Sequence, residues 1–249
     1  MALDVPQSES SIRRILRASP WDPREVLWTK VGICHALDFM HLGPLGSWGR
    51  LLTLQEERSR FKPLWELRPN WTSQTVARYL EEAWESLGVP LIVKHDQGPE
   101  FISSYFQGFL TAHHVLSLPN PPYRGSYNGK EERLNGFIRA WTRPLELHDR
   151  PDLLPQVLAE AYQDLNFERP LQVLGARTPY DVFSTARRVL PANRDDLLQA
   201  AERFTTMHAC DLALKERGLL LKRKAAVVAA QEVGLLVIRP SQKCQPISA

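Results

Sequence analysis

A nearly continuous apolar run, VGICHALDFM at residues 31–40, constrains the fold more than any other stretch. It has the length of a strand, and apolar residues on both alternating faces predict a central strand of a sheet. Asp38 lies inside this run. Burial of its carboxylate among Leu37, Phe39 and Met40 is costly unless a partner group or a metal ion compensates it. We favour a functional role for Asp38 over the alternative of a strand-end aspartate that reaches water.

The segments that follow predict a mixed α/β order. Strands at about 50–57 and 60–67, joined by short turns, would complete an antiparallel meander with the apolar run. The elements predicted next are, in order, a helix from Thr72 or Ser73 to Gly88, a strand at 91–93, a helix at about 101–114, a strand at 115–118, a helix after Asn128, a helix at 152–167 and a helix opened by Thr178, Pro179 and Asp181. From 193 to about 231 the pattern is helical, with a division at Gly218, and the last dozen residues are expected to fray.

Two further carboxylates stand at the ends of predicted elements. The short strand Leu91–Val93 runs directly into HDQG, which places Asp96 at the carboxyl end of a strand, where α/β sheets collect functional groups. A turn-forming aspartate near a glycine is the alternative. In YNGKEER, Asn128 is a good N-cap and Glu131 completes a capping box, so Glu132 is left to face an acidic site.

Asp38, Asp96 and Glu132 come from two strands and one helix that could converge at one edge of the sheet. Clustered carboxylates repel one another and need a compensating charge. Oxygen ligands without a competing Cys/His set favour Mg²⁺ or Mn²⁺. Two such ions can activate an attacking oxygen and stabilise a leaving one in phosphodiester displacement. The sequence therefore predicts metal-dependent phosphoryl chemistry.

The order of elements is that of the ribonuclease H-like fold, and the spacing of the carboxylates resembles the DDE integrase and transposase catalytic core. Between Asp96 and Glu132 lie 35 residues, and the two aspartates are 58 positions apart. HDQGPEF at 95–101 resembles the family's D-N-G-x-E-F turn, YNGKEER at 127–133 resembles its N-G-x-x-E helix start, and residues 166–183 resemble its N-x-x-R-P-H-x-x-L-G-x-x-T-P stretch. Three departures are Gln97 for the usual Asn, His35 for an aromatic residue before the first aspartate, and Gln172 for the usual His.

This resemblance, which covers roughly residues 28–185, implies an α/β fold with a mixed five-stranded sheet flanked by helices. It implies DNA cleavage and strand transfer in which Asp38, Asp96 and Glu132 hold two Mg²⁺ or Mn²⁺ ions, and water or a DNA 3′-hydroxyl attacks a phosphodiester. It also implies a homo-oligomer that brings two DNA ends together. Two other interpretations remain open: a catalytically silent, transposase-derived DNA-binding protein, and a ribonuclease H-fold nuclease that cuts without joining.

Basic and aromatic residues near the predicted helix start and in the tail are candidate DNA contacts. From Pro191 onward there are 9 basic and 6 acidic residues, against 22 of each before it, so the net charge of +3 arises in the tail. A solvated helix face is the alternative for the tail, and packing of the loop against the core is the alternative for the aromatic residues. The candidate contacts are Arg124, Tyr127, Asn128, Lys130, Arg133, Arg139, Lys222, Arg223 and Lys224.

The sequence predicts three parts: an arm at 1–27 with a short helix at 8–18, interpreted as a remnant of a helix-turn-helix; a catalytic core at 28–190; and a basic, mostly helical extension at 191–249. No zinc-type domain or full helix-turn-helix is found, which leaves two alternatives: a truncated open reading frame, or the catalytic half of a two-part transposase with a separate DNA-binding subunit. No apolar stretch is long enough for a membrane span or a signal peptide, and three scattered cysteines form no disulfide framework. We therefore expect a cytoplasmic protein, nucleoid-associated if bacterial.

Overall fold

The computed structural model describes residues 24–120, 129–208 and 215–240. Trp28–Leu236 form one compact unit, and residues 24–27 and 237–240 belong to a second one. In a two-stranded sheet, β1 (Arg24–Trp28) pairs with β7 (Leu236–Pro240). The expectation of a frayed end is therefore wrong for Ile238–Pro240, because a distant strand supplies their hydrogen-bond partners. The helix predicted at 8–18 lies outside the described residues.

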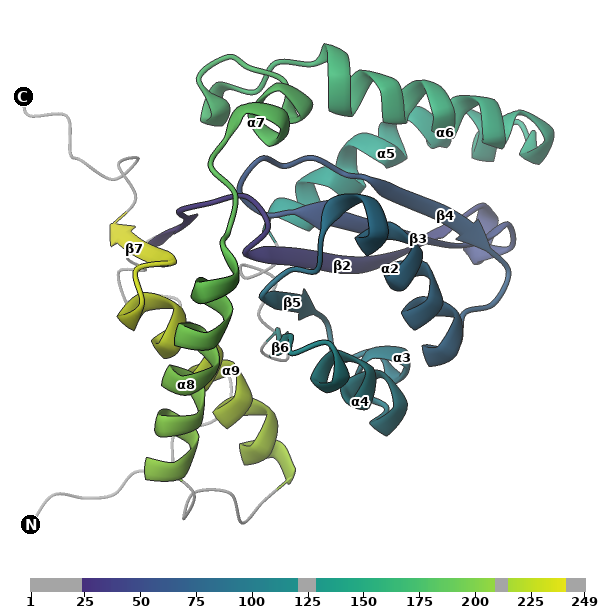
Figure 1. The fold of residues 1–249 in the computed structure, drawn as a ribbon. Coiled ribbons are helices and arrows are strands. Elements are labelled where there is room, and N and C mark those ends of the chain that lie inside the picture. Colours follow the sequence, from purple (N-terminus) through teal and green to yellow (C-terminus); the bar gives the residue numbers. More distant parts are fainter. Residues whose placement is uncertain (1–23, 121–128, 209–214, 241–249) are drawn as a thin grey trace, which may run out of the picture. The chain divides into compact units, whose positions relative to one another are not determined.

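The main unit is built on a five-stranded mixed sheet with the strand order β4-β3-β2-β5-β6 (Figure 1). Its strands are β2 (Cys34–Leu42), β3 (Gly49–Glu56), β4 (Leu64–Arg68), β5 (Ile92–His95) and β6 (Leu116–Pro119). The first three form the predicted antiparallel meander, and β5 and β6 run parallel to β2. The mixed five-stranded sheet expected from the sequence is confirmed, with the apolar run at its centre.

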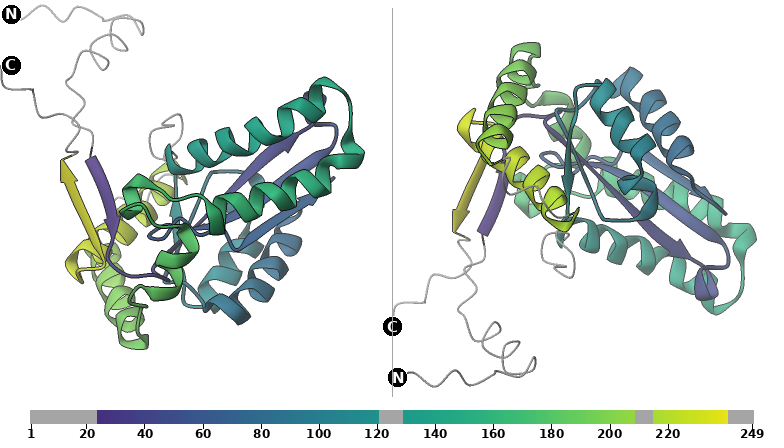
Figure 2. Two further views of the ribbon diagram at one scale, coloured as in Figure 1. Left: turned by 90° about the horizontal axis from the view of Figure 1, so that it is seen from above. Right: turned by 90° about the horizontal axis from the view of Figure 1, so that it is seen from below.

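Helices cover both faces of this sheet (Figures 1 and 2). On one face lie α2 (Ser73–Leu87), α3 (Pro99–Ile102) and α4 (Ser104–Ala112), and on the other α5 (Gly129–Leu147) and α6 (Leu154–Gln163). The chain continues through α7 (Pro179–Thr185), α8 (Pro191–Met207) and α9 (Lys215–Glu232), with single turns of other helix types at Pro44–Gly46, Pro151–Leu153, Asp164–Glu168 and Gln172–Leu174. Helix α9 packs against α8 and against the edge strand β6. No helix in the described ranges is long and apolar enough to cross a membrane.

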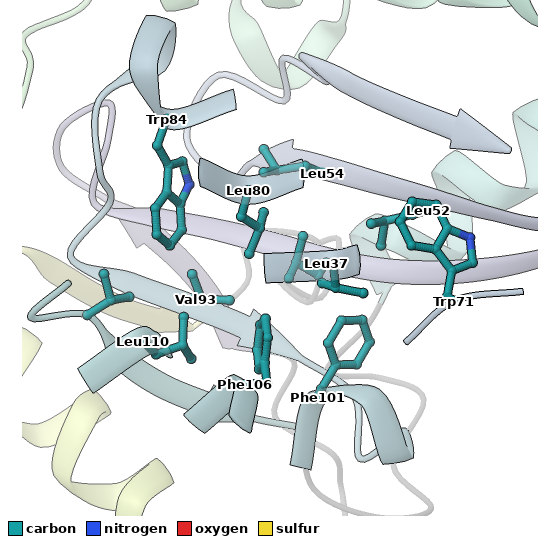
Figure 3. Packing of buried hydrophobic residues seen from close by; sticks show 12 residues of the cluster. Leu37, Leu52, Leu54, Trp71, Leu80, Trp84, Val93, Phe101, Phe106 and Leu110 are labelled. Atoms are coloured by element: carbon teal, nitrogen blue, oxygen red, sulfur yellow. The ribbon is translucent and has the colours of Figure 1, made fainter. Parts of the chain in front are cut away.

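The alternation of side chains along β2 divides the core in two. Leu37 points to the α2–α4 face, where it packs in a cluster with Leu54, Leu80, Phe101 and Phe106 (Figure 3). Met40 and Leu42 point to the opposite face and pack with residues of α5 and α6, such as Leu134, Ile138 and Leu154. Because Asp38 is two residues before Met40, it shares the α5 face of the sheet.

Several predicted helix boundaries are confirmed by their caps. Thr72 and Thr178 accept hydrogen bonds from the backbone N–H groups of Thr75 and Asp181 at 3.2 Å each, and Pro179 opens α7 as predicted. Gly88 ends α2 with a φ of 82°, a conformation that costs glycine little.

Other boundaries differ from the prediction. The helix expected at 101–114 is broken at Ser103, because this residue is extended and its hydroxyl caps the N–H of Phe106 at 3.1 Å. The third strand begins at Leu64 instead of residue 60, after a turn in which Arg60 has a φ of 65°. The tail divides between Met207 and Lys215, and Gly218 lies within α9. Helix α6 gives way to a π-helical turn at Asp164–Glu168, a wider turn that periodicity alone does not predict.

Candidate active site

Asp38 lies on β2, and Asp96 directly follows its parallel neighbour β5. In the β2–β5 pair, Cys34 lies opposite Ile92 and Ala36 lies opposite Lys94. Two residues further along both segments come Asp38 and Asp96, which puts both carboxylates on the α5 face at the carboxyl end of β5. Burial raises the pKa of Asp38, and the negative charge of Asp96 raises it further, against the opposing hydrogen bond from Asn135. The two aspartates are therefore close enough to repel one another.

The turn after β5 fixes the carboxylate of Asp96. Its Oδ1 accepts the backbone N–H of Gly98 at 2.8 Å, and Gln97 Nε2 donates to the carbonyl oxygen of Asn120 at 2.8 Å. Gln97, which departs from the family's usual Asn, thus joins this turn to the end of β6. Gly98 fits closely here, since a Cβ on it would lie 2.9 Å from Asp96 Oδ1.

Helix α5 contributes a residue that the sequence interpretation missed. Asn135 Nδ2 donates to Asp38 Oδ2 at 2.7 Å, which fixes the orientation of the first aspartate. Glu131 and Glu132 lie in the first turn of α5, four and three residues before Asn135, but their side chains are outside the described part. Residues at these spacings share a helix face, so the i, i+3 relation of Glu132 to Asn135 was the signal that could have found Asn135.

The donor set fits a hard divalent cation. Asp38 and Asp96 supply carboxylate oxygens that repel one another without a countercharge, and oxygen-only ligands suit Mg²⁺ or Mn²⁺. Among the described residues, no group of three or more His, Cys, Asp or Glu side chains could hold a metal ion. The side chain of Glu132 lies outside these described residues.

The histidines beside the aspartates belong to the core. His35 and His95 are buried, and burial lowers the pKa of His35 to about 3 and also lowers that of His95. The two ring nitrogens of His95 are within hydrogen-bond distance of the Asp96 carbonyl oxygen, at 2.6 Å, and of Ser117 Oγ, at 2.8 Å. Both imidazoles are therefore uncharged near neutral pH, and His95 supports the strand end that carries Asp96.

The predicted DNA contacts on the opening helix have different surroundings. Arg124, Tyr127 and Asn128 lie outside the described residues. Arg133 and Arg139 are exposed on α5. Lys130 is half-buried and pairs with the carboxylate of Glu57, a partner that the sequence did not indicate.

The predicted contacts in the tail lie on α9, beside β6. Lys222 donates to Gln107 Oε1 at 3.1 Å, and Arg223 donates to the carbonyl oxygen of Pro119 at 2.9 Å. Pro119 lies opposite His95, the residue before Asp96, and Lys222 acts electrostatically on His95. Lys224 is exposed on the same helix. The basic tail is thus adjacent to the edge of the sheet that carries Asp96.

Comparison with known proteins identifies the kind of core. Residues 30–124, which contain Asp38 and Asp96 and end before Glu132, match the family described as integrase core domain. The resemblance to integrase catalytic cores is confirmed. The Gag-Pro-Pol polyprotein of Human T-cell leukemia virus 2 is 36% identical over 66 residues, which are 26% of this chain and 4% of the polyprotein. The chain thus spans a small fraction of that relative.

Solved structures share the integrase-core fold. The HTLV-2 integrase catalytic core domain in complex with magnesium, in trimeric form, has a TM-score of 0.50 and 24% identity, over 61% of this chain and 96% of that one. Its dimeric form gives a TM-score of 0.50 and 23% identity, over 62% and 97%. A simian T-cell lymphotropic virus intasome in complex with PP2A regulatory subunit B56 gamma gives a TM-score of 0.56 and 20% identity, over 66% and 60%.

Proposed function

We propose that this protein is a DDE-type integrase or transposase that catalyses metal-dependent DNA cleavage and strand transfer. The observation that carries the proposal is the position of Asp38 on β2 and of Asp96 directly after the parallel strand β5, with the Asn135 amide of α5 hydrogen-bonded to Asp38 at 2.7 Å. A carboxylate on the turn of α5 before Asn135 can then complete an oxygen-donor set. The match of residues 30–124 to the integrase core domain supports the same activity.

In this proposal Asp38, Asp96 and Glu132 hold two Mg²⁺ or Mn²⁺ ions. When bound, such a pair activates the attacking oxygen and stabilises the leaving oxygen of a phosphodiester. The chain's own groups set the geometry: Asn135 orients Asp38, and the N–H of Gly98 orients Asp96. The neighbouring structures in complex with magnesium support the choice of cation.

DNA would approach the sheet edge where β5 and β6 end. Arg133 and Arg139 on α5 and Lys222 and Lys224 on α9 are exposed cations that can contact phosphates without reading base sequence. Arg124, Tyr127, Asn128 and Arg223 complete the proposed set, whereas Lys130, also expected as a contact from the sequence, is engaged by Glu57. In this proposal residues 28–190 are the catalytic core and 191–249 an extension that adds positive charge. A homo-oligomer bound to DNA, assisted by a separate DNA-binding subunit, is the proposed working form.

Strand transfer with the matching element ends and Mg²⁺ tests the function, with the wild type compared with Glu132→Gln and Glu131→Gln. We expect Glu132→Gln to abolish both cleavage and joining, and Glu131→Gln to keep most of the activity, because Glu131 is assigned to the helix cap. Equal loss in both variants would contradict the assignment of Glu132. DNA binding without wild-type activity would instead support a silent, transposase-derived protein, and cleavage without joining would support a nuclease.

A further inference from the structure

A buried carboxylate outside the proposed triad lies beside the start of α5. Glu57 follows the last residue of β3, is 3% exposed, and its N–H donates to the carbonyl oxygen of Cys34 on β2 at 3.0 Å. Its Oε1 accepts from Lys94 Nζ at 3.0 Å, and its Oε2 accepts from Lys130 Nζ. Arg60 lies further away, at 3.9 Å from Oε2. Burial of a carboxylate is costly without such partners, so Glu57 depends on these cations to stay ionised in the core.

The sheet register explains how these groups meet. Ala36 lies between Gln55 on β3 and Lys94 on β5, on the α5 face of the sheet. Because the alanine side chain is small, Lys94 can extend across β2 toward Glu57, one side-chain row away. Along the strands, the row of Lys94 thus lies between the row of Glu57 and the row of Asp38 and Asp96. The ion cluster is therefore built into the sheet next to the proposed metal site.

Lys130 brings the helix to this cluster. It stands in the first turn of α5, two residues before Glu132, and Lys130 Nζ also donates to the carbonyl oxygen of Glu57 at 3.3 Å. The apolar residues that pack α5 on the sheet, Leu134 and Ile138, come one and two turns later. Lys130 therefore reaches the sheet one turn before the apolar contacts of α5 begin.

We propose that Glu57 is a positioning residue: by holding Lys130, it fixes the first turn of α5, and with it the backbone that carries Glu132, against β2 and β3. The ion pair acts through the helix and does not touch the reacting atoms. The role of this turn in metal binding rests on the proposed function, whereas the attachment of the turn to the sheet does not. Lys130 is assigned here to Glu57 instead of to DNA.

Hydrogen–deuterium exchange of the amides of residues 133–136, whose N–H groups donate to the carbonyl oxygens of the first turn of α5, tests the attachment directly in the full chain. We expect Glu57→Gln and Lys130→Met to speed exchange there, and the double variant to exchange no faster than the single ones, since both remove the same link. Lys130→Arg, which keeps the charge and the donors, should restore slow exchange. Glu66→Gln is the matched control, because it breaks an ion pair with Arg68 on β4, where the glutamate side chain is 34% exposed.

Mn²⁺ binding measured by electron paramagnetic resonance gives the second measurement. A displaced first turn should weaken Mn²⁺ binding about 10-fold in Lys130→Met, as for residues that orient metal ligands, and leave Glu66→Gln unchanged. Unchanged exchange in Lys130→Met would overturn the proposal, even if Glu57→Gln is poorly folded. Faster exchange in a protein whose wild type binds no Mn²⁺ would leave the attachment standing and contradict the proposed function instead.

Discussion

Asp38 is half-buried in the central strand, and its carboxylate lies near that of the second aspartate, Asp96. Burial and the neighbouring charge both raise its pKa, and they outweigh the opposing effects of the Asn135 hydrogen bond, a backbone hydrogen bond at Phe39 and the charge of Lys94. A raised carboxyl pKa means that ionisation at neutral pH lowers the free energy of unfolding. At this position the residue that best suits the proposed chemistry is not the one that best suits the stability of the fold.

We expect Asp38→Asn to raise the melting temperature of the metal-free protein at neutral pH by about 2–4 °C, a shift typical of about 1 kcal/mol in a chain of this size. The penalty of the ionised aspartate is complete above its raised folded pKa. It decreases as the pH falls through the raised pKa and disappears below the ordinary value of 3.8, where the carboxyl is protonated in both states. Melting curves from pH 8 to pH 4 should show the gain shrinking with acidity.

The same melting curves recorded with Mn²⁺ separate the loss of metal binding from the electrostatic effect on stability. The wild type should be stabilised by the ion, and Asp38→Asn should not be. Asp152→Asn is the control, and it should lower the melting temperature at neutral pH where Asp38→Asn raises it. Arg150 holds the pKa of Asp152 below its usual range, and the variant loses that ion pair. If Asp38→Asn lowered the melting temperature at neutral pH, the electrostatic account of this position would be wrong.

Among the elements, the turn between β5 and α3 places the second aspartate. The N–H of Gly98 holds Asp96 Oδ1 at 2.8 Å, and Gln97 bonds to the carbonyl oxygen of Asn120 at 2.8 Å. Gly98 has a φ of −58°, which any residue can adopt. Glycine is therefore not required here for its backbone conformation. It matters because a Cβ would come too close to the Asp96 carboxylate.

We expect Gly98→Ala to weaken Mn²⁺ binding about 10-fold with little change in melting temperature. The added Cβ would lie 2.9 Å from Asp96 Oδ1, so the flexible carboxylate must move while the backbone stays. Isothermal titration with Mn²⁺ and thermal unfolding measure the two effects.

Gly108→Ala is the matched control for that variant. Gly108 lies in α4, and a Cβ there meets no atom within 4 Å. This variant should stabilise the protein by about 0.5–1 kcal/mol through helix propensity and leave Mn²⁺ binding as it is. Equal metal affinity in the wild type and Gly98→Ala would show that this turn does not position a ligand.

At the scale of the molecule, residues 191–236 of the predicted extension belong to the same compact unit as the sheet. Helix α9 packs against β6, and Arg223 caps the carbonyl oxygen of Pro119 at 2.9 Å. The excess positive charge of the chain is thereby placed next to the strand end that carries Asp96. A polyanion at the proposed active site would meet these cations.

We expect Lys222→Glu combined with Lys224→Glu to weaken DNA binding and to reduce the salt dependence of the affinity. The slope of log K against log salt should fall by about 1–2, since each phosphate contact contributes about one unit. Arg223 is left in place because its guanidinium bonds to the fold. Fluorescence anisotropy across a salt series measures the slope.

Arg78→Glu on α2 is the control for the charge reversal, because Arg78 is 59% exposed on the face of the sheet opposite α5. It should leave the salt slope unchanged. An unchanged slope in the double variant of α9 would remove the extension from the DNA interface.

The sequence alone determined the central strand, the meander, the caps of α2 and α7, and the three candidate carboxylates with their spacing. Each of these depends on periodicity, local capping or fixed separations that neighbouring residues encode. Helix α5 was also predicted, but the roles of Glu131 and Glu132 stay predictions.

Only the tertiary structure decided the contacts between distant segments. Asn135 on Asp38, Lys130 on Glu57, α9 on β6 and the pairing of β7 with β1 each join residues far apart in the chain. The break at Ser103 also escaped the sequence pattern, and the division of the tail was predicted at Gly218, inside α9, instead of between Met207 and Lys215. Such features depend on which elements come to lie together, and that follows from packing the two faces of one sheet at once.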